Sequence, residues 1–517
     1  MNNELIEKRT FSLTESVFAW LCYFAGYAFC RAFPVMEFPL GGFLFIVAVF
    51  TFTAIFLKIQ KHKFRTWPTI VAASAIAISV SLLVSTNTFL YFWTFSYAMA
   101  AYCYFVYSVL GNNIKNDFSD FMLFDFFKAI IVLPFASISK LFLAMFTGKA
   151  KSSGKMIGKI FIGVGLTLIP TIVVIRLLSY DSNFLDLLAK IIDFDLKTII
   201  SHIGSLGFAI PIGMYLFGLY ASSVENKGKE TIKAEDCSKA YQSLKIAPKL
   251  TVITAVVPLV FIYVIFFISQ WDYYISGFVG SLPDEFSYAE FAREGFFQLC
   301  IVSLINLLVI FAVVLFMRRN VAERSITLKI ISIVFAICTF VLISTAIAKM
   351  VMYIDSYGLT PKRVYSTWFM IVIASIFIVI FICQFTKRIK AVAVSFSVCV
   401  VLLTVLSVIN IDGLIASYNV NRYIDGSLKT VDMRAMDDLG DAAIPELVRL
   451  SEHLDNKYGT DISAEECGSE DETYQELHQK LHNAAFNFEY YRDEESIFAK
   501  NIPVLRAERA LKRINLI

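Results

Sequence analysis

Apolar stretches of about twenty residues alternate with short polar gaps along the first 411 residues of the chain. Such a stretch crosses a bilayer as an α-helix, because a helix satisfies its own backbone hydrogen bonds in the hydrocarbon core. The pattern predicts an all-α, polytopic membrane protein with about eleven transmembrane helices. The predicted spans are 16–33, 39–57, 66–85, 88–110, 157–178, 198–222, 250–270, 296–317, 327–348, 366–385 and 391–411.

One further apolar stretch, residues 118–148, differs from these spans because charged residues interrupt it. Asp125, Lys128 and Lys140 divide it, and its longest uncharged piece, 129–139, is too short to cross a bilayer. We therefore predict an interfacial segment that lies along the membrane or re-enters it.

The lysines and arginines between the spans fall mainly into alternate gaps. One alternate set of gaps holds 25 of these residues and the other holds 7. Because basic loops are retained on the cytoplasmic side, this asymmetry predicts a cytoplasmic N-terminus. An odd number of spans then places the C-terminal part of the chain outside the cytoplasm.

Charge also divides the chain along its length. Residues 412–517 hold 21 acidic and 12 basic residues, which gives a net charge of −9. Because the whole chain has a net charge of +3, residues 1–411 carry +12. We predict a transmembrane domain at 1–411 and an acidic helical domain at 412–517. The acidic domain would repel phosphate, so nucleic acid is excluded as a partner, and the lipid bilayer is the expected one.

Three polar segments fall in gaps that the charge asymmetry places outside the cytoplasm. They have the patterns R-x-x-F-F, YGLT-x-x-R-x-Y-x-x-W and N-x-x-x-x-x-A-x-YN-x-x-R-Y, in this order along the chain. In this sequence they are Arg293–Phe297, Tyr357–Trp368 and Asn410–Tyr423.

This ordered set of segments resembles the bacterial membrane proteins grouped as domain of unknown function 4173 and its relative 4153. The resemblance covers mainly residues 280–450. It implies a multi-pass protein of the bacterial plasma (inner) membrane, and the family supplies no activity to carry over.

The three segments supply the candidate site residues. Arginine offers a planar fork of donors suited to phosphate or carboxylate, so the arginines indicate an anionic envelope ligand, while nearby carboxylates could balance charge or transfer protons. A structural role is the alternative, with the aromatic residues forming an interfacial belt and the arginines pairing with carboxylates to pack loops. The candidates are Arg293, Glu294, Asp355, Tyr357, Arg363, Tyr365, Trp368, Asp412, Asn419 and Arg422.

The sequence predicts no cofactor and no metal site. His478 and His482 are spaced to share a metal on a helix, but no clear third ligand accompanies them. No nucleotide-binding or nucleophile motif is present, and the catalytic residues, if any, are unknown.

Three functions fit these features. The preferred hypothesis is binding or sensing of an envelope ligand at the outer face, because the unusual polar residues gather there. The alternatives are transport of a small solute or lipid, and catalysis on a lipid-linked substrate; the sequence favours a protein that is not an enzyme.

Overall fold

The computed structural model contains helices and no strand in the residues that it describes, which confirms the all-α polytopic membrane architecture. Within that part of the chain, nine helices are long and apolar enough to cross a bilayer. The described residues are 10–32, 39–115, 117–146, 170, 174, 196–225, 234–269, 288–317, 326–386, 389–458, 472–491 and 499–517.

The nine helices correspond to nine of the predicted spans. The predicted span at 157–178 lies almost wholly outside the described residues. The predicted span at 88–110 forms helix α5, Thr88–Val109, which is rich in tyrosine and is not among the nine. The helix predicted at 327–348 is longer than expected: α17 runs from Ile326 to Tyr357.

The chain forms two compact units, and the first comprises Met1–Ser79, Phe95–Asp117 and Phe121–Ile232. Helices of this unit approach one another closely at two glycines, which have no side chain. A Cβ added at Gly26 would lie 2.6 Å from the Ala209 carbonyl oxygen, and one at Gly213 would lie 3.0 Å from Tyr23 Cα. The helices are α1 (Leu13–Ala32), α2 (Pro39–Ile59), α3 (Thr66–Ser79), most of α5, and α11 (Leu196–Val224).

The segment that follows α5 in this unit consists of short helical pieces. Their sequence is α6 (Met122–Phe127), a π-helical turn (Lys128–Val132), α7 (Leu133–Ala136) and α8 (Lys140–Met145). None of these pieces is long enough to span a bilayer. Asp125 is fully buried in the segment and accepts hydrogen bonds from Tyr107 Oη at 2.7 Å and from the Ile114 amide at 2.9 Å.

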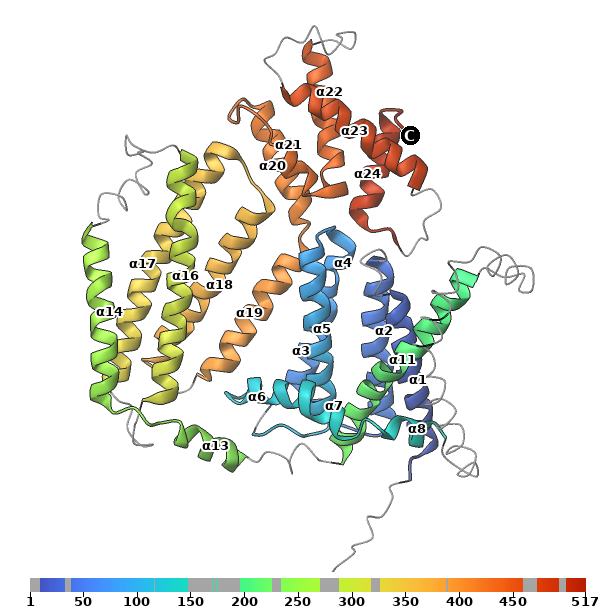
Figure 1. The fold of residues 1–517 in the computed structure, drawn as a ribbon, viewed down its shortest axis with the longest axis vertical. Coiled ribbons are helices and arrows are strands. Elements are labelled where there is room, and N and C mark those ends of the chain that lie inside the picture. The colour runs from blue at the N-terminus through green and yellow to red at the C-terminus, as the bar shows by residue number, and fades with distance from the viewer. Residues whose placement is uncertain are drawn as a thin grey trace, which may run out of the picture. The chain divides into compact units, whose positions relative to one another are not determined.

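The second unit comprises Val80–Thr94, Phe118–Asp120 and Lys233–Ile517. Its membrane helices α16, α17 and α18 run side by side (Figure 1) and share a buried apolar core with α14. A buried polar link, in which Asn306 Nδ2 donates to Thr339 Oγ1 at 2.9 Å, joins α16 to α17. The helices are α4 (Ser81–Val84), the start of α5, α13 (Ala234–Ser243), α14 (Lys249–Ser269), α16 (Tyr288–Phe316), α17, α18 (Pro361–Cys383) and α19 (Ala391–Val408).

The helices after α19 in the second unit build a separate apolar core. Leu359, from the turn between α17 and α18, and Val364, at the start of α18, pack against this core. The C-terminal helices therefore rest on the end of the bundle where α17 gives way to α18. They are α20 (Ile411–Ile424), α21 (Met433–Asp437), the 3-10 turn η2 (Gly440–Ala442), α22 (Ile444–Tyr458), α23 (Glu472–Tyr491) and α24 (Ile502–Arg513).

Candidate functional site

The turn between α17 and α18 is held by an asparagine from α20. Asn419 Nδ2 donates to the Leu359 carbonyl at 2.8 Å, and its Oδ1 accepts from the Leu359 amide at 2.7 Å. Gly358 has a φ of +74°, and a Cβ there would lie 2.5 Å from Asn419 Oδ1, so a side chain fits neither the backbone conformation nor the space. Thr360 caps α18 and Pro361 begins it.

Arg363 and Arg422 both donate to main-chain carbonyls at this turn. Arg363 Nη1 donates to the carbonyls of Tyr357, at 3.0 Å, and Gly358, and its guanidinium lies 4.0 Å from the centre of the Tyr353 ring. The second and third sequence segments are therefore brought together at the end of α17.

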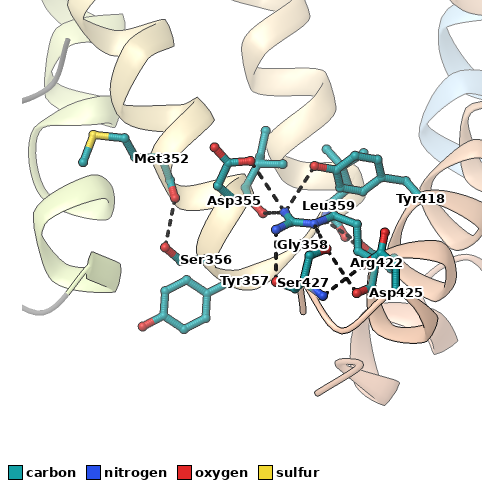
Figure 2. Close-up of polar contacts among 12 residues, drawn as sticks. Met352, Asp355, Ser356, Tyr357, Gly358, Leu359, Tyr418, Arg422, Asp425 and Ser427 are labelled. Carbon is teal, nitrogen blue, oxygen red and sulfur yellow. Dashed lines mark hydrogen bonds and ion pairs between the residues drawn. The ribbon is translucent and has the colours of Figure 1, made fainter. Parts of the chain in front are cut away.

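Arg422 reaches the same helix end from α20, as Figure 2 shows. Its Nη1 donates to the Ile354 carbonyl at 3.3 Å, and its Nε donates to Ser427 Oγ at 3.0 Å. The ion pair with Asp355 is 3.6 Å long, and the Asp355 side chain is 64% exposed, so the pair contributes little to stability. Both arginines therefore donate chiefly to main-chain carbonyls of the protein.

Asp412 lies in a different environment, at the first turn of α20. Its side chain is buried, with only 1% of the residue exposed, and its Oδ2 accepts a hydrogen bond from Ser85 Oγ at 2.8 Å. The other oxygen, Oδ1, is buried and has no hydrogen-bond partner among the described residues. Across the described part of the chain, no basic side chain forms an ion pair with this carboxylate.

The turn that carries Ser85 gathers the first residues of three helices. Asn87 accepts from the Phe89 amide at the start of α5, and Asn501 accepts from the Val504 amide at the start of α24. Asn501 also donates to the Ser85 carbonyl at 3.0 Å. With α20, three helix N-termini thus meet around Ser85, and their dipoles favour negative charge there.

Burial nevertheless raises the pKa of the Asp412 carboxyl above its ordinary value. Desolvation is the dominant cause, and it is opposed only in part by hydrogen bonding from Ser85, the Thr86 amide and Asn87. The group is therefore poised to take up a proton more readily than an exposed aspartate.

A tyrosine hydroxyl from α18 lies near this carboxylate. In the part of the chain that the structure describes, Tyr365 Oη is buried without a hydrogen-bond partner, and the residue interacts electrostatically with Asp412. The Tyr365 ring packs 5.7 Å from that of Phe89, at the start of α5. Among the described residues, the site therefore contains two buried polar atoms that make no hydrogen bond, Asp412 Oδ1 and Tyr365 Oη.

A family model described as Domain of unknown function (DUF4153) matches residues 72–450, which is more than half of the chain. The chain belongs to the DUF4153 family. The resemblance to the relative 4153 is thus confirmed, whereas that to domain 4173 is not. No curated protein and no solved structure matches the chain. The matched range contains Ser85, Tyr365 and Asp412, and α23 and α24 lie beyond it.

The remaining candidate residues do not join the Asp412 site. Trp368 Nε1 donates to the Leu402 carbonyl at 3.3 Å and so links α18 to α19. Tyr357 is exposed and packs edge-to-face on Tyr353. Arg293 and Glu294 belong to the first turns of α16, but their side chains lie outside the described residues.

The candidates predicted from the sequence did not include Ser85, Tyr91 or Asn501. Tyr91 Oη donates to the Ser85 carbonyl at 2.5 Å and accepts from Asn501 Nδ2 at 3.1 Å. The signals were present locally, because Ser-Thr-Asn before an apolar run and Asn before Ile-Pro are both typical of helix starts. Nothing in the local pattern indicated that these helix starts meet.

Proposed function

We propose that this DUF4153 protein is a membrane sensor that binds a cation, the proton included, at Asp412. The observation that carries the proposal is a buried carboxylate oxygen that lies near a tyrosine hydroxyl, where neither atom has a hydrogen-bond partner among the residues that the structure describes. A carboxylate in such a place is neutralised by protonation or by a cationic partner, because an isolated buried charge is costly. Either ligand would engage Asp412 Oδ1.

The arginines favour this proposal over an anionic ligand. Arg363 and Arg422 donate to carbonyls at the end of α17 and so serve as ties between helices. An incoming phosphate or carboxylate would have to displace those contacts. The Asp412 site requires no such exchange.

Sensing is favoured because the site connects the membrane helices to the C-terminal domain. Tyr365 belongs to α18, a membrane helix, whereas Asp412 and Asn501 lie at the starts of α20 and α24. A change of charge on Asp412 therefore acts on all three elements at once. The charge asymmetry of the loops assigns this end of α17–α18 to the outer face, so the proposed stimulus is external.

Hydrogen–deuterium exchange tests this proposal on the full-length protein in lipid nanodiscs. We expect residues 411–416 and 502–507 to lose protection together as pH rises, after correction for the intrinsic exchange rate. The reason is that ionisation places an unsolvated charge at the site. Asp412→Asn should abolish this response, and Asp438→Asn, which alters an exposed aspartate on the same domain, should keep it. An unchanged response in Asp412→Asn would refute the proposal.

Transport is a second candidate because of one buried cation in a membrane helix. Lys349 is only 1% exposed and lies within α17, although the sequence had placed it in a loop. Ionisable residues inside membrane helices often mark ion pathways. Proton flux into liposomes containing the protein, measured with an internal pH dye, would support this candidate if Lys349→Gln removed it. Absence of flux in the wild type would eliminate it.

A further inference from the structure

A cavity of about 490 Å³ opens in the C-terminal domain, and Asp412 is not among the residues that line it. Residues of α21, η2 and α22 line one side of it, and residues of α23 line the other. Its volume lies within the range of small-ligand sites, roughly 300–1,000 Å³.

The floor of the cavity is fixed by the domain core. Met436, Ile444, Leu447, Leu481 and Phe488 line it and are also buried members of the apolar core of this domain. Because such side chains are close-packed, the floor is a preformed surface. A ligand that lies on it gains apolar contact without reorganising the domain.

One wall carries a row of primary amides. Gln479, Asn483 and Asn487 are exposed, line the cavity and follow one another at four-residue spacing along α23. Within the described residues, none of the three side chains takes part in a hydrogen bond. Four residues of helix rise about 6 Å, so the amides form a ladder with that step.

This step is close to the repeat of an extended peptide. Two residues of a strand advance about 6.6 Å, and their N–H and C=O groups recur on one side at that interval. A primary amide both donates and accepts, so it can pair with the N–H and the C=O of one residue. Asn419 already makes this pairing with Leu359 elsewhere in the protein.

The charges around the cavity narrow the choice of peptide. Asp437, Asp441 and Glu476 line it together with Arg434 and Lys480, so carboxylates outnumber cations. Lys480 is engaged, since its Nζ pairs with Asp437 and donates to the Met433 carbonyl at 2.9 Å. The excess of negative charge favours a peptide that carries a basic side chain.

We infer that this cavity binds an extended peptide segment of about five residues, bearing a basic residue, through main-chain pairing with the amide ladder of α23. The length follows from the distance along α23 between Glu476 and Asn487, about 16 Å at the rise of a helix. Asp412 is not among the residues that line the cavity, so the inference does not rest on its proposed role.

The test uses full-length protein in nanodiscs and a fluorescein-labelled pentapeptide, acetyl-Ala-Ala-Lys-Ala-Ala-amide, followed by fluorescence anisotropy. We expect saturable binding at or below millimolar concentration. Asn483→Ala with Asn487→Ala should weaken it about tenfold or more, the scale of losing two hydrogen bonds. Asn456→Ala, at an exposed position of α22 outside the cavity, is the matched control and should bind as the wild type does.

Two further probes separate main-chain recognition from other binding. The same peptide with N-methylated amides lacks the donors and should not bind. Chitopentaose tests the alternative that the amides recognise sugar hydroxyls. The inference is overturned if the wild type fails to bind the peptide, if the N-methylated peptide binds equally, if Asn456→Ala loses as much affinity, or if chitopentaose binds more tightly. Alanine at these exposed helical positions favours the helix, so the variants should fold.

Discussion

Removing the hydroxyl of Ser85 should destabilise the protein mainly through its effect on Asp412. Ser85 Oγ donates a hydrogen bond to the Asp412 carboxylate at 2.8 Å in a buried site. A hydrogen bond to a charged group contributes about 1.5–3 kcal/mol, so we expect Ser85→Ala to lower the free energy of unfolding by that amount near neutral pH.

The same substitution should cost less when the carboxylate is already neutral. Asp412→Asn keeps a hydrogen-bond acceptor for Ser85 and removes the buried charge, so on its own it should leave stability unchanged or raise it. In that background Ser85→Ala breaks a bond between neutral groups, worth about 0.5–1.5 kcal/mol. The double-mutant cycle should therefore give a coupling energy of about 1 kcal/mol or more.

The pH dependence follows from the direction of the pKa shift. Because burial raises the Asp412 pKa in the folded state, the charged form is the destabilised one. The contribution of Asp412 to stability is then greatest below the ordinary pKa of aspartate, falls as pH rises through the raised pKa, and is constant above it. The total fall is about 1.4 kcal/mol for each unit by which the folded-state pKa exceeds the unfolded-state pKa. Ser85→Ala should raise the pKa further and extend the fall to higher pH, whereas Asp412→Asn should lack this component.

Unfolding in sodium dodecyl sulfate, followed by tryptophan fluorescence at several pH values, measures these free energies. Two results would refute the reasoning. An equal cost of Ser85→Ala in both backgrounds would mean that the hydroxyl does not serve the carboxylate. A loss of more than about 3 kcal/mol in Asp412→Asn would mean that the charge has a stabilising partner.

The turn between α17 and α18 yields three further predictions, each checked by the same unfolding assay. Gly358→Ala should cost about 1–3 kcal/mol, because the residue has a positive φ and its Cβ would meet Asn419; an unchanged stability would contradict this close approach. Asn419→Ala should cost about 2–3 kcal/mol through two lost hydrogen bonds to Leu359, and a cost below 1 kcal/mol would show that the pairing is dispensable. Arg422→Gln should cost about 1–3 kcal/mol, whereas Asp355→Asn should cost less than about 1 kcal/mol; equal costs would mean that the ion pair, and not the carbonyl contacts, ties α20 to α17.

The sequence predicted the membrane helices because their signal is strong and local. A run of twenty apolar residues is sufficient to indicate a span, whereas the interfacial position of 118–148 stays a prediction that rests on the charges within it. The end of α17 was misplaced because Lys349 and Asp355 suggested a loop, whereas the helix continues and Lys349 is buried within it.

The candidate site was predicted less well, for reasons of geometry. Loop topology sufficed to place the segments of Arg363 and Arg422 at one end of the bundle. It could not show that these side chains point at main-chain carbonyls, because carbonyl directions depend on the turn itself. Asp412 was predicted as a candidate that could balance the arginine charges or transfer protons, and its contact with Ser85, 327 positions earlier, could not be read from the local pattern.

The contact between Ser85 and Asn501 also has a consequence for synthesis of the chain. These residues are 416 positions apart, and the ribosome adds roughly 5–20 residues per second. Once Ser85 has been made, its turn therefore waits roughly 20–80 s for the asparagine that completes it. During that interval the carbonyl of Ser85 lacks the side chain of Asn501 that donates to it. An unfinished chain would thus display polar groups that a finished one conceals, a difference on which proteolytic quality control could act.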